Sequence, residues 1–285
     1  MRPRRRWWQA GAAALALAAA VAVATVEPLQ AAAQSFLDLF HAQRLQPVTL
    51  DRSFLASLPR ASGPEAFGRF RLTGGGRQLA ATPAEAESLL GGRTLYVLKV
   101  AGWQAAGGWE VTGPAEASLT LDRAKLEQYL RQAGWSDARL PQALDGATFT
   151  ARIPAVAGSR WQGPGGLEVR LFQGAEPQLL APAGLDPRLL EQLLLQAPNL
   201  PADLRRQLQA LGDWRQVLPV PVPQGTVSRR ASVRGALDAL YLADPAGGGA
   251  GVLLWLEPGG DVLALAGHGL SEAQLAALAA SVQAR

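Results

Sequence analysis

The 285-residue sequence predicts an α+β fold, in which helices cover a curved, mainly antiparallel sheet, preceded by one N-terminal transmembrane helix or signal segment. Strand-like segments follow one another across short glycine turns, which favours antiparallel pairing. Helices with recognisable start signals stand between the groups of strands. An uncharged apolar run occupies residues 7–26, directly after a basic start. These three observations define the fold class and place a membrane segment before it.

Residues 7–26 have the length of a transmembrane helix. At about 1.5 Å per residue the run spans roughly 30 Å, the thickness of the hydrocarbon core of a bilayer. The positive-inside rule then makes residues 1–6 a cytoplasmic basic tail and places residues 27–285 outside the cytoplasm. A cleaved signal peptide is the alternative, because small residues precede a cut near Ala33 and would leave a secreted protein. Either way the domain lies outside the cytoplasm, and with the N-terminal segment retained the membrane is the first partner we expect.

The excess positive charge lies entirely in the basic tail. Of the 27 Lys and Arg residues, four lie within residues 1–6, which leaves 23 to balance the 23 acidic residues of the rest of the chain. The neutral body gives no support to a nucleic-acid groove. Cysteine is absent, which excludes disulfides and thiolate metal sites.

Helix and strand signals alternate in the first half of the body. Apolar residues at helical spacing predict a helix over residues 34–44. Thr82-Pro83-Ala84-Glu85 combines a capping box with proline at the first helical position, so a helix begins there. Asp122 caps another helix, which ends at Gly134. Alternation and β-forming residues predict strands over residues 46–50, 93–100, 109–112, 118–121 and 147–154, and the glycine-rich stretch 102–109 predicts a loop between strands.

The second half begins with a strand and two helices. A turn at residues 163–166 leads into a strand over residues 167–172, and proline start signals open helices at Asp186-Pro187 and at Pro201. Alternating prolines make residues 219–223 extended. We expect residues 27–285 to form one extracytoplasmic α+β domain, with two subdomains that meet near residues 159–166 as the alternative.

The chain ends in a meander of strands and one helix. The strands are expected over residues 229–233, 237–243, 251–257 and 262–266, separated by glycine turns. Because residues 252–256 are apolar throughout, both faces of that strand should be covered. The final helix, which starts with a capping box at Ser271 and Gln274, is the expected cover of one face.

No motif in the sequence carries recognisable catalytic, cofactor or metal chemistry. The two histidines, His41 and His268, belong to no metal-ligand spacing, and no nucleophile elbow or phosphate loop is found. Arg229, Arg230 and Arg234 are expected to be solvated and balanced by acidic neighbours. We therefore expect a protein that is not an enzyme and that has no catalytic residues, cofactor or metal site.

Three tryptophans are the candidate binding residues. Trp103, Trp109 and Trp161 lie beside glycine-rich stretches, where they could line an apolar groove for a lipid, an acyl chain or a peptide. Packing in the core is the competing interpretation for each of them.

Segments of the last third carry a family resemblance. They are LLLQAPNLPADL at residues 193–204, DWRQVLPVPVP at residues 213–223 and AGVLLW at residues 250–255, which is followed by the strand and helix of residues 261–272. With the start AQSFLDLF at residues 33–40, they resemble the extracytoplasmic domain that follows the membrane helix of some bacterial anti-sigma-factor-like proteins. That domain is distantly similar to the folds of periplasmic lipoprotein carriers and sigma-E regulators.

The resemblance implies a membrane-anchored sensory or regulatory binding module in an envelope signalling system. Residues 1–6 are too few to form the cytoplasmic sigma-binding domain of such proteins, so this chain would act through a partner, either an envelope protein or a lipid ligand. Two alternatives stay open: a carrier-like binder of lipid or another apolar ligand, and an uncharacterised secreted hydrolase.

Overall fold

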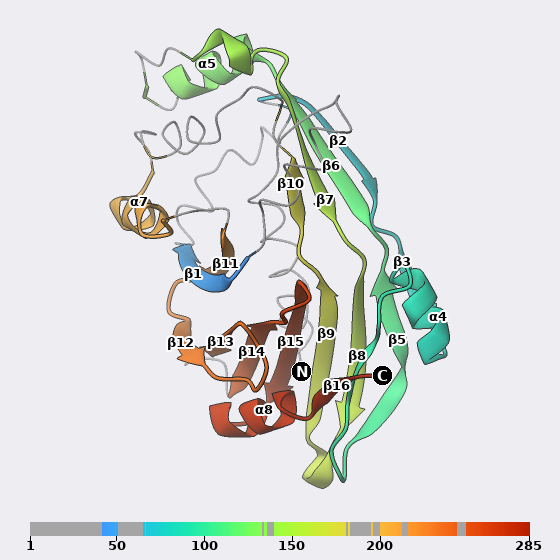
Figure 1. Cartoon of the computed structure of the whole chain (residues 1–285). Helices are drawn as coiled ribbons and strands as arrows, with labels where there is room; N and C mark the ends of the chain where they lie inside the picture. The colour runs from blue at the N-terminus through green and yellow to red at the C-terminus, as the bar shows by residue number, and fades with distance from the viewer. Residues whose placement is uncertain are drawn as a thin grey trace, which may run out of the picture.

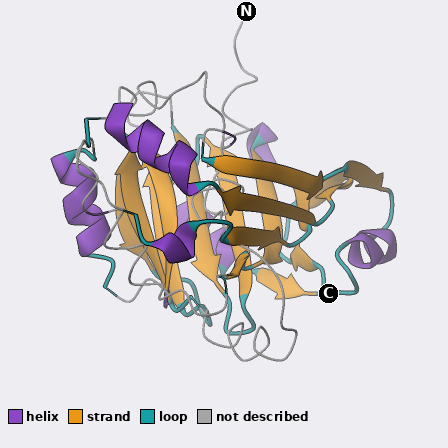
Figure 2. Ribbon diagram, turned by 90° about the horizontal axis from the view of Figure 1, so that it is seen from above, coloured by secondary structure: helices purple, strands orange, loops and turns teal. Residues whose placement is uncertain are grey.

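The structure is a computed structural model. It describes residues 42–50, 65, 67–132, 134–135, 140–180, 182, 195, 200–212, 216–243 and 249–285. Over these residues the protein is a mixed α+β fold with mostly antiparallel sheets, which confirms the predicted class. The α-helices of the described part are α4 (Pro83–Leu89), α5 (Arg123–Gln132), α7 (Ala202–Gln209) and α8 (Glu272–Ala279). In Figure 2 the helices lie around the outside of the strands.

An eight-stranded antiparallel sheet forms the centre of the fold, in the order β12-β13-β14-β15-β9-β8-β5-β3 (Figure 1). Its strands are β3 (Arg77–Ala80), β5 (Gln104–Thr112), β8 (Val156–Gln162), β9 (Glu168–Ala175), β12 (Val227–Ala231), β13 (Asp238–Ala243), β14 (Ala250–Leu256) and β15 (Asp261–His268). The meander predicted for the end of the chain is therefore confirmed, as β12 to β15.

A second, four-stranded sheet extends half of the first sheet. Its strands, in the order β10-β7-β6-β2, are β10 (Gln178–Leu180), β7 (Thr148–Ile153), β6 (Ala115–Leu121) and β2 (Gly68–Gly74). They continue β9, β8, β5 and β3 end to end (Figure 1). The register passes unchanged across the junction, because Gly74 pairs with Ala115 and, three residues further along each strand, Arg77 pairs with Thr112.

Each junction between the two sheets contains proline or glycine. The four connecting pairs are Gly75-Gly76, Gly113-Pro114, Pro154-Ala155 and Glu176-Pro177. Proline lacks the N–H that a ladder needs, and Gly75 has a φ of 79°, outside the strand region. Four long strands are thereby interrupted at the same level.

Two small sheets complete the fold. β1 (Arg44–Leu50) and β11 (Val217–Pro223) form a parallel pair, and β4 (Tyr96–Leu98) pairs with β16 (Val282–Ala284). The extended segments expected at residues 46–50 and 219–223 are thus confirmed. The helix expected over residues 34–44 is wrong at its end, because Arg44 begins a strand; residues 34–41 lie outside the described residues.

Both faces of the eight-stranded sheet are buried at its β12–β15 end. On one face, α8 places Leu275 and Leu278 against a cluster that includes the fully buried Trp255. On the other face, Leu254 and neighbouring apolar residues pack against β1 and β11. The continuous apolar run of β14 is therefore covered on both sides, as the sequence predicts, and α8 begins with the predicted capping box at Ser271.

The glycine-rich stretch 102–109 is mostly strand, which corrects the predicted loop. β5 begins at Gln104, and between its pairings Ala105↔Trp161 and Trp109↔Ser159 it contains a bulge. Gly108 is needed because a Cβ there would lie 2.3 Å from the carbonyl oxygen of Ala80. The glycines permit a bulge and a close approach of backbones, which a single sequence does not distinguish from a turn.

The remaining predicted helices and strands agree with the structure where it describes them. α4, α5 and α7 begin at or next to the expected residues, and β4 is shorter than the strand predicted over residues 93–100. The expected start at Asp186-Pro187 lies outside the described residues. No helix within the described ranges is long and apolar enough to cross a bilayer, and residues 7–26 are not among them.

Candidate functional site

The three candidate tryptophans lie in two separate parts of the core. Trp161 is buried in the cluster below α8, and Trp103 packs against that cluster, where its indole lies over Gly163. Trp109 is buried in another cluster, beneath α4. Two hollows in the described surface, of about 430 and 530 Å³, are lined by other residues. Trp109 and Trp161 are buried core side chains, Trp103 is half-buried against the core, and none of the three lines either hollow, so the apolar-groove hypothesis gains no support from their placement.

Trp161 and Trp109 differ in whether the indole N–H group has a hydrogen-bond acceptor, so replacing them should lower the stability by different amounts. Trp161 donates to Ser159 Oγ at 2.9 Å, whereas the buried N–H of Trp109 has no acceptor within the described part of the chain. Trp161→Phe should lose about 1 kcal/mol more stability than Trp109→Phe, because only Trp161→Phe breaks a hydrogen bond. Urea unfolding of both variants measures the difference, and an equal loss would contradict the hydrogen bond to Ser159.

The parallel pair β1–β11 lacks backbone donors along the outer edge of β11. In a parallel pair, alternate residues of each strand direct their N–H and C=O groups toward the partner strand. Every second residue of β11 from Pro219 to Pro223 is proline, and the residues between the prolines can donate their N–H groups to β1. The prolines lie at the positions that face the opposite edge of β11, and proline has no N–H group to donate there. A further strand could not pair along that edge.

Side chains occupy the outer edge of β1. Leu45 donates its N–H to Asp238 Oδ2 at 2.7 Å, and Pro47 has no N–H. The N–H of Thr49 donates to Gln207 Oε1 at 2.6 Å, while Gln207 Nε2 donates to the Thr49 carbonyl at 3.4 Å. Gln207 therefore bonds both backbone groups of one residue, as a neighbouring strand would. β1 is held by side chains instead of a further strand.

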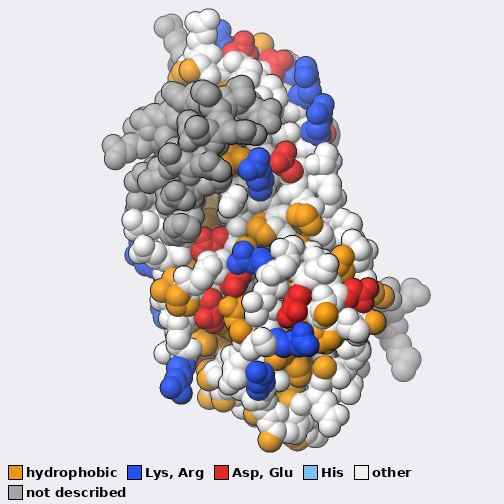
Figure 3. All heavy atoms as spheres, turned by 45° about the vertical axis from the view of Figure 1, so that its right-hand side comes forward, with side chains coloured by type: hydrophobic (Ala, Val, Ile, Leu, Met, Phe, Trp, Pro, Cys, Tyr) orange, Lys and Arg blue, Asp and Glu red, His pale blue; other side chains and the backbone are white. Residues whose placement is uncertain are grey.

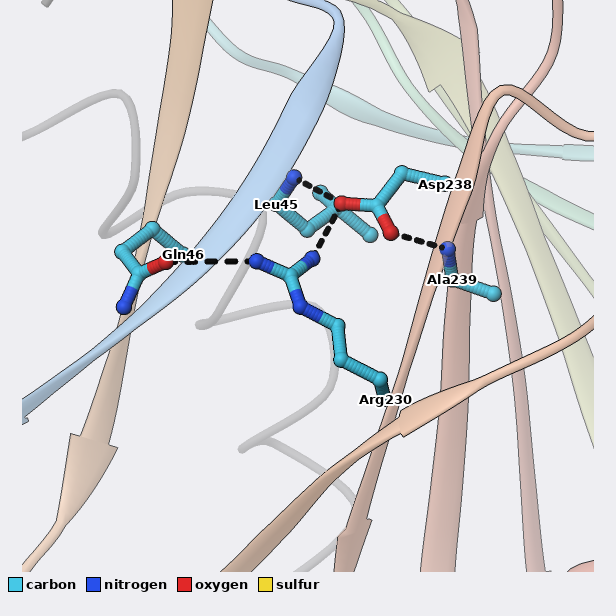
Figure 4. Close-up of polar contacts among 5 residues, drawn as sticks. All are labelled: Leu45, Gln46, Arg230, Asp238 and Ala239. Carbon is cyan, nitrogen blue, oxygen red and sulfur yellow. Dashed lines mark hydrogen bonds and ion pairs between the residues drawn. The ribbon is translucent and has the colours of Figure 1, made fainter. Parts of the chain in front are cut away.

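Asp238 is the centre of the polar contacts that hold β1 (Figure 4). Its carboxylate accepts from the N–H groups of Leu45 and Ala239 and forms an ion pair with Arg230, and only 15% of its side chain is exposed. Arg230 also donates to Gln46 Oε1 at 3.2 Å. The contacts connect β1 to both β12 and β13. The acidic partner expected for Arg230 is therefore present, and Arg229 has one in Glu272.

Apolar packing places β1 between the sheet and α7. Leu45 is fully buried against the face of the sheet opposite α8. Val48 is buried with Leu204 and Leu208 of α7. Just before β1, the N–H of Ala42 donates to Glu176 Oε2 at 3.1 Å. The first described strand is thus integrated into the core on two sides and clamped along its edge.

A second glutamine, Gln173, holds β4 against the sheet in the same way as Gln207 holds β1, by bonding both backbone groups of one residue. The buried Gln173 of β9 accepts from the N–H of Tyr96 at 2.6 Å and donates to its carbonyl at 3.3 Å. The Tyr96 hydroxyl donates to Asp261 Oδ2 at 3.1 Å, and Arg93 pairs with the same carboxylate. Burial, reinforced by the negative charge of Asp261 and the hydrogen bond to it, raises the pKa of Tyr96 to about 12.

The raised pKa of Tyr96 predicts a loss of stability at high pH. A group whose pKa is higher in the folded state contributes its full stabilisation below the unfolded pKa of about 10, and this is lost as pH rises toward 12. Tyr96→Phe should therefore be less stable than the wild type at pH 8, and the difference should shrink between pH 10 and 12. Urea unfolding of both proteins across this range tests it, and a constant difference would contradict the assignment.

The described residues bring together no group of three or more His, Cys, Asp or Glu side chains that could hold a metal ion. His268 is exposed at the end of β15, and His41 lies outside the described residues. On the face seen in Figure 3, acidic and basic side chains are interspersed. The sequence signals missed Asp238, Gln207 and Gln173, although Pro47 and the alternating prolines of β11 mark the two edges that need no further strand.

No family model matches this chain, and neither the curated proteins nor the solved structures include a match to it.

Proposed function

We propose that the protein is a membrane-anchored, extracytoplasmic, non-catalytic binding module with a sensory or regulatory role, of the type found in bacterial anti-sigma systems. In this proposal residues 7–26 are the anchor and residues 27–285 form one domain with a curved sheet outside the cytoplasm. The module would act through an envelope partner.

The anchoring of β1 is the observation that carries the proposal. β1 is the first described strand after the apolar segment, and it is clamped by Asp238 and Gln207 and buried by Leu45 and Val48. A membrane segment at residues 7–26 would therefore be connected to a strand of the core. Such a connection suits a module whose position and conformation depend on its anchor.

Membrane topology is the direct test. The full chain with a C-terminal epitope, expressed in a Gram-negative host, should remain in the membrane fraction after alkaline carbonate washing. Protease added to spheroplasts should remove the epitope, and protease added to intact cells should not. A chain lacking residues 7–26 is the matched control and should be soluble and protected in spheroplasts. A mature N-terminus near Ala33 would contradict the anchor, and protection of the full chain in spheroplasts would contradict the extracytoplasmic location.

The carrier alternative predicts a different result with the same protein. A carrier of apolar ligands would release bound lipid when the purified domain is extracted with organic solvent. The cluster below α8 is filled by Trp255, Leu253 and Leu263, all fully buried, and the hollows beside α7 and α5 have mixed polar and apolar walls. We therefore expect mass spectrometry of the extract to show no stoichiometric lipid.

A further inference from the structure

One long strand edge of the described sheets is open. β2 and β3 form consecutive edges of the two main sheets, and each pairs with a strand on one side only. Residues 68–80 contain no proline, and the side chains of Leu72 and Leu79 are 60% and 80% exposed. An edge of this kind is a template for strand addition.

Other edges of the described part are blocked or short. The outer edges of β1 and β11 are closed by prolines and by the clamps from Asp238 and Gln207. β10, the far edge of the four-stranded sheet, has three residues. β12, the far edge of the eight-stranded sheet, has five residues. The open edge at β2–β3 is an exception to this pattern.

The backbone of β2 has N–H groups available for a partner. Asp122 N donates to the Phe67 carbonyl, so Phe67 faces β6 and alternate residues after it also face β6. The N–H and C=O groups of Gly68, Phe70 and Leu72 therefore point away from β6. Gly68 is buried, so a partner strand would bond to the groups of Phe70 and Leu72.

The charge of β2 selects the partner. Arg69 and Arg71 alternate along the strand, so both lie on one face, and both are exposed. Within the described residues neither has an ion-pair partner, whereas Arg77 of β3 pairs with Glu110 at 3.3 Å. The residues opposite Arg69 and Arg71 on an added strand would lie about 4.5–5.5 Å away, which favours acidic side chains.

A second copy of the chain is the wrong occupant. Two β2 strands that pair through their outward residues place the arginines of both copies on the same face, and opposed like charges destabilise a strand pair. We propose that the β2–β3 edge binds an extended segment of a partner protein, with acidic residues at alternate positions, by strand addition. This surface would give the proposed binding module its partner, and it does not depend on the membrane anchor.

Peptide binding to the purified full chain in detergent tests the proposal. A fluorescent peptide of alternating Glu and Val should bind, measured by anisotropy, and a matched peptide of alternating Lys and Val should bind at least about tenfold more weakly. Arg69→Glu with Arg71→Glu should reverse the preference. Raising the salt concentration should weaken binding of the acidic peptide.

Backbone variants separate strand addition from simple charge attraction. Leu72→Pro removes an outward N–H and should abolish binding, whereas Leu72→Ala keeps the backbone donor and should retain it. Hydrogen exchange should show new protection of residues 68–74 when the acidic peptide is present. No binding of the acidic peptide, equal binding of both peptides, or full binding by Leu72→Pro would overturn the proposal. Because no step uses the membrane, a failure here is distinguishable from a failure of the topology test.

Discussion

Replacing Asp238 with alanine should lower the free energy of unfolding by about 2–4 kcal/mol, a large effect for one polar side chain. The substitution leaves the N–H of Leu45 without its acceptor and removes the partner of Arg230. The Arg230 side chain is half exposed, so water can solvate its guanidinium once Asp238 is gone. The expected loss of unfolding free energy is therefore smaller than for a fully buried ion pair. Urea unfolding followed by tryptophan fluorescence measures the change.

Asp203→Ala is the matched control for Asp238→Ala. Asp203 pairs with Arg206 on the surface of α7, where both side chains are largely exposed, so its loss should cost less than about 1 kcal/mol. Asp238→Asn keeps an acceptor for the Leu45 N–H and should fall between the two. Hydrogen exchange adds a local measurement, because Asp238→Ala should lower protection in β1 before it does so in β14. Equal destabilisation by Asp238→Ala and Asp203→Ala would contradict the conclusion that Asp238 holds β1 in place.

The parts of the fold that the sequence predicts are those with local signals. Thr82 caps α4 by accepting from the N–H of Glu85, and Ser271 forms the predicted capping box with Gln274; in both cases the two residues are three apart. The carboxylate of Glu85 accepts from the N–H of Ala81, so the reciprocal bond of the capping box predicted at Thr82 is absent. Glycines in the sequence also separate the strands β12 to β15. The alternating prolines of β11 likewise dictate extended backbone. In each case the deciding interactions lie within a few residues of one another along the chain.

The clamps of β1 and β4 could not be predicted in this way. Gln207 and Gln173 are separated from the backbones they bond by long stretches of sequence, and an isolated glutamine has the pattern of a solvated residue. Asp238 looks like the ordinary start of a strand until Arg230 and Leu45 are placed beside it. For the three tryptophans a local signal was present but did not decide between two interpretations. A glycine beside a tryptophan is equally compatible with a binding groove and with close packing, as where the indole of Trp103 lies over Gly163.

Gly68→Ala should destabilise the protein by about 3 kcal/mol or more, at the upper end of the cost of overpacking. A Cβ at Gly68 would lie 1.8 Å from the carbonyl oxygen of Thr120, and that oxygen belongs to the backbone of β6, so no side-chain rotation relieves the clash. β2 would have to move away from β6 at its first residue. Thermal unfolding and urea unfolding of the purified chain both report this loss.

Gly76→Ala is the control for Gly68→Ala, because it lies just past the other end of β2, with no atom within 4 Å of the added Cβ. Its φ is not among the positive values, so alanine should be neutral or stabilise by up to about 1 kcal/mol, through the unfolded chain. Similar losses for both variants would show that β2 does not approach β6 as described. Because Gly68 begins the open edge, Gly68→Ala should also weaken binding of the acidic peptide, whereas Gly76→Ala should leave binding at β2 intact. Comparing these two variants therefore tests whether the packing of β2 against β6 is needed for β2 to bind the peptide.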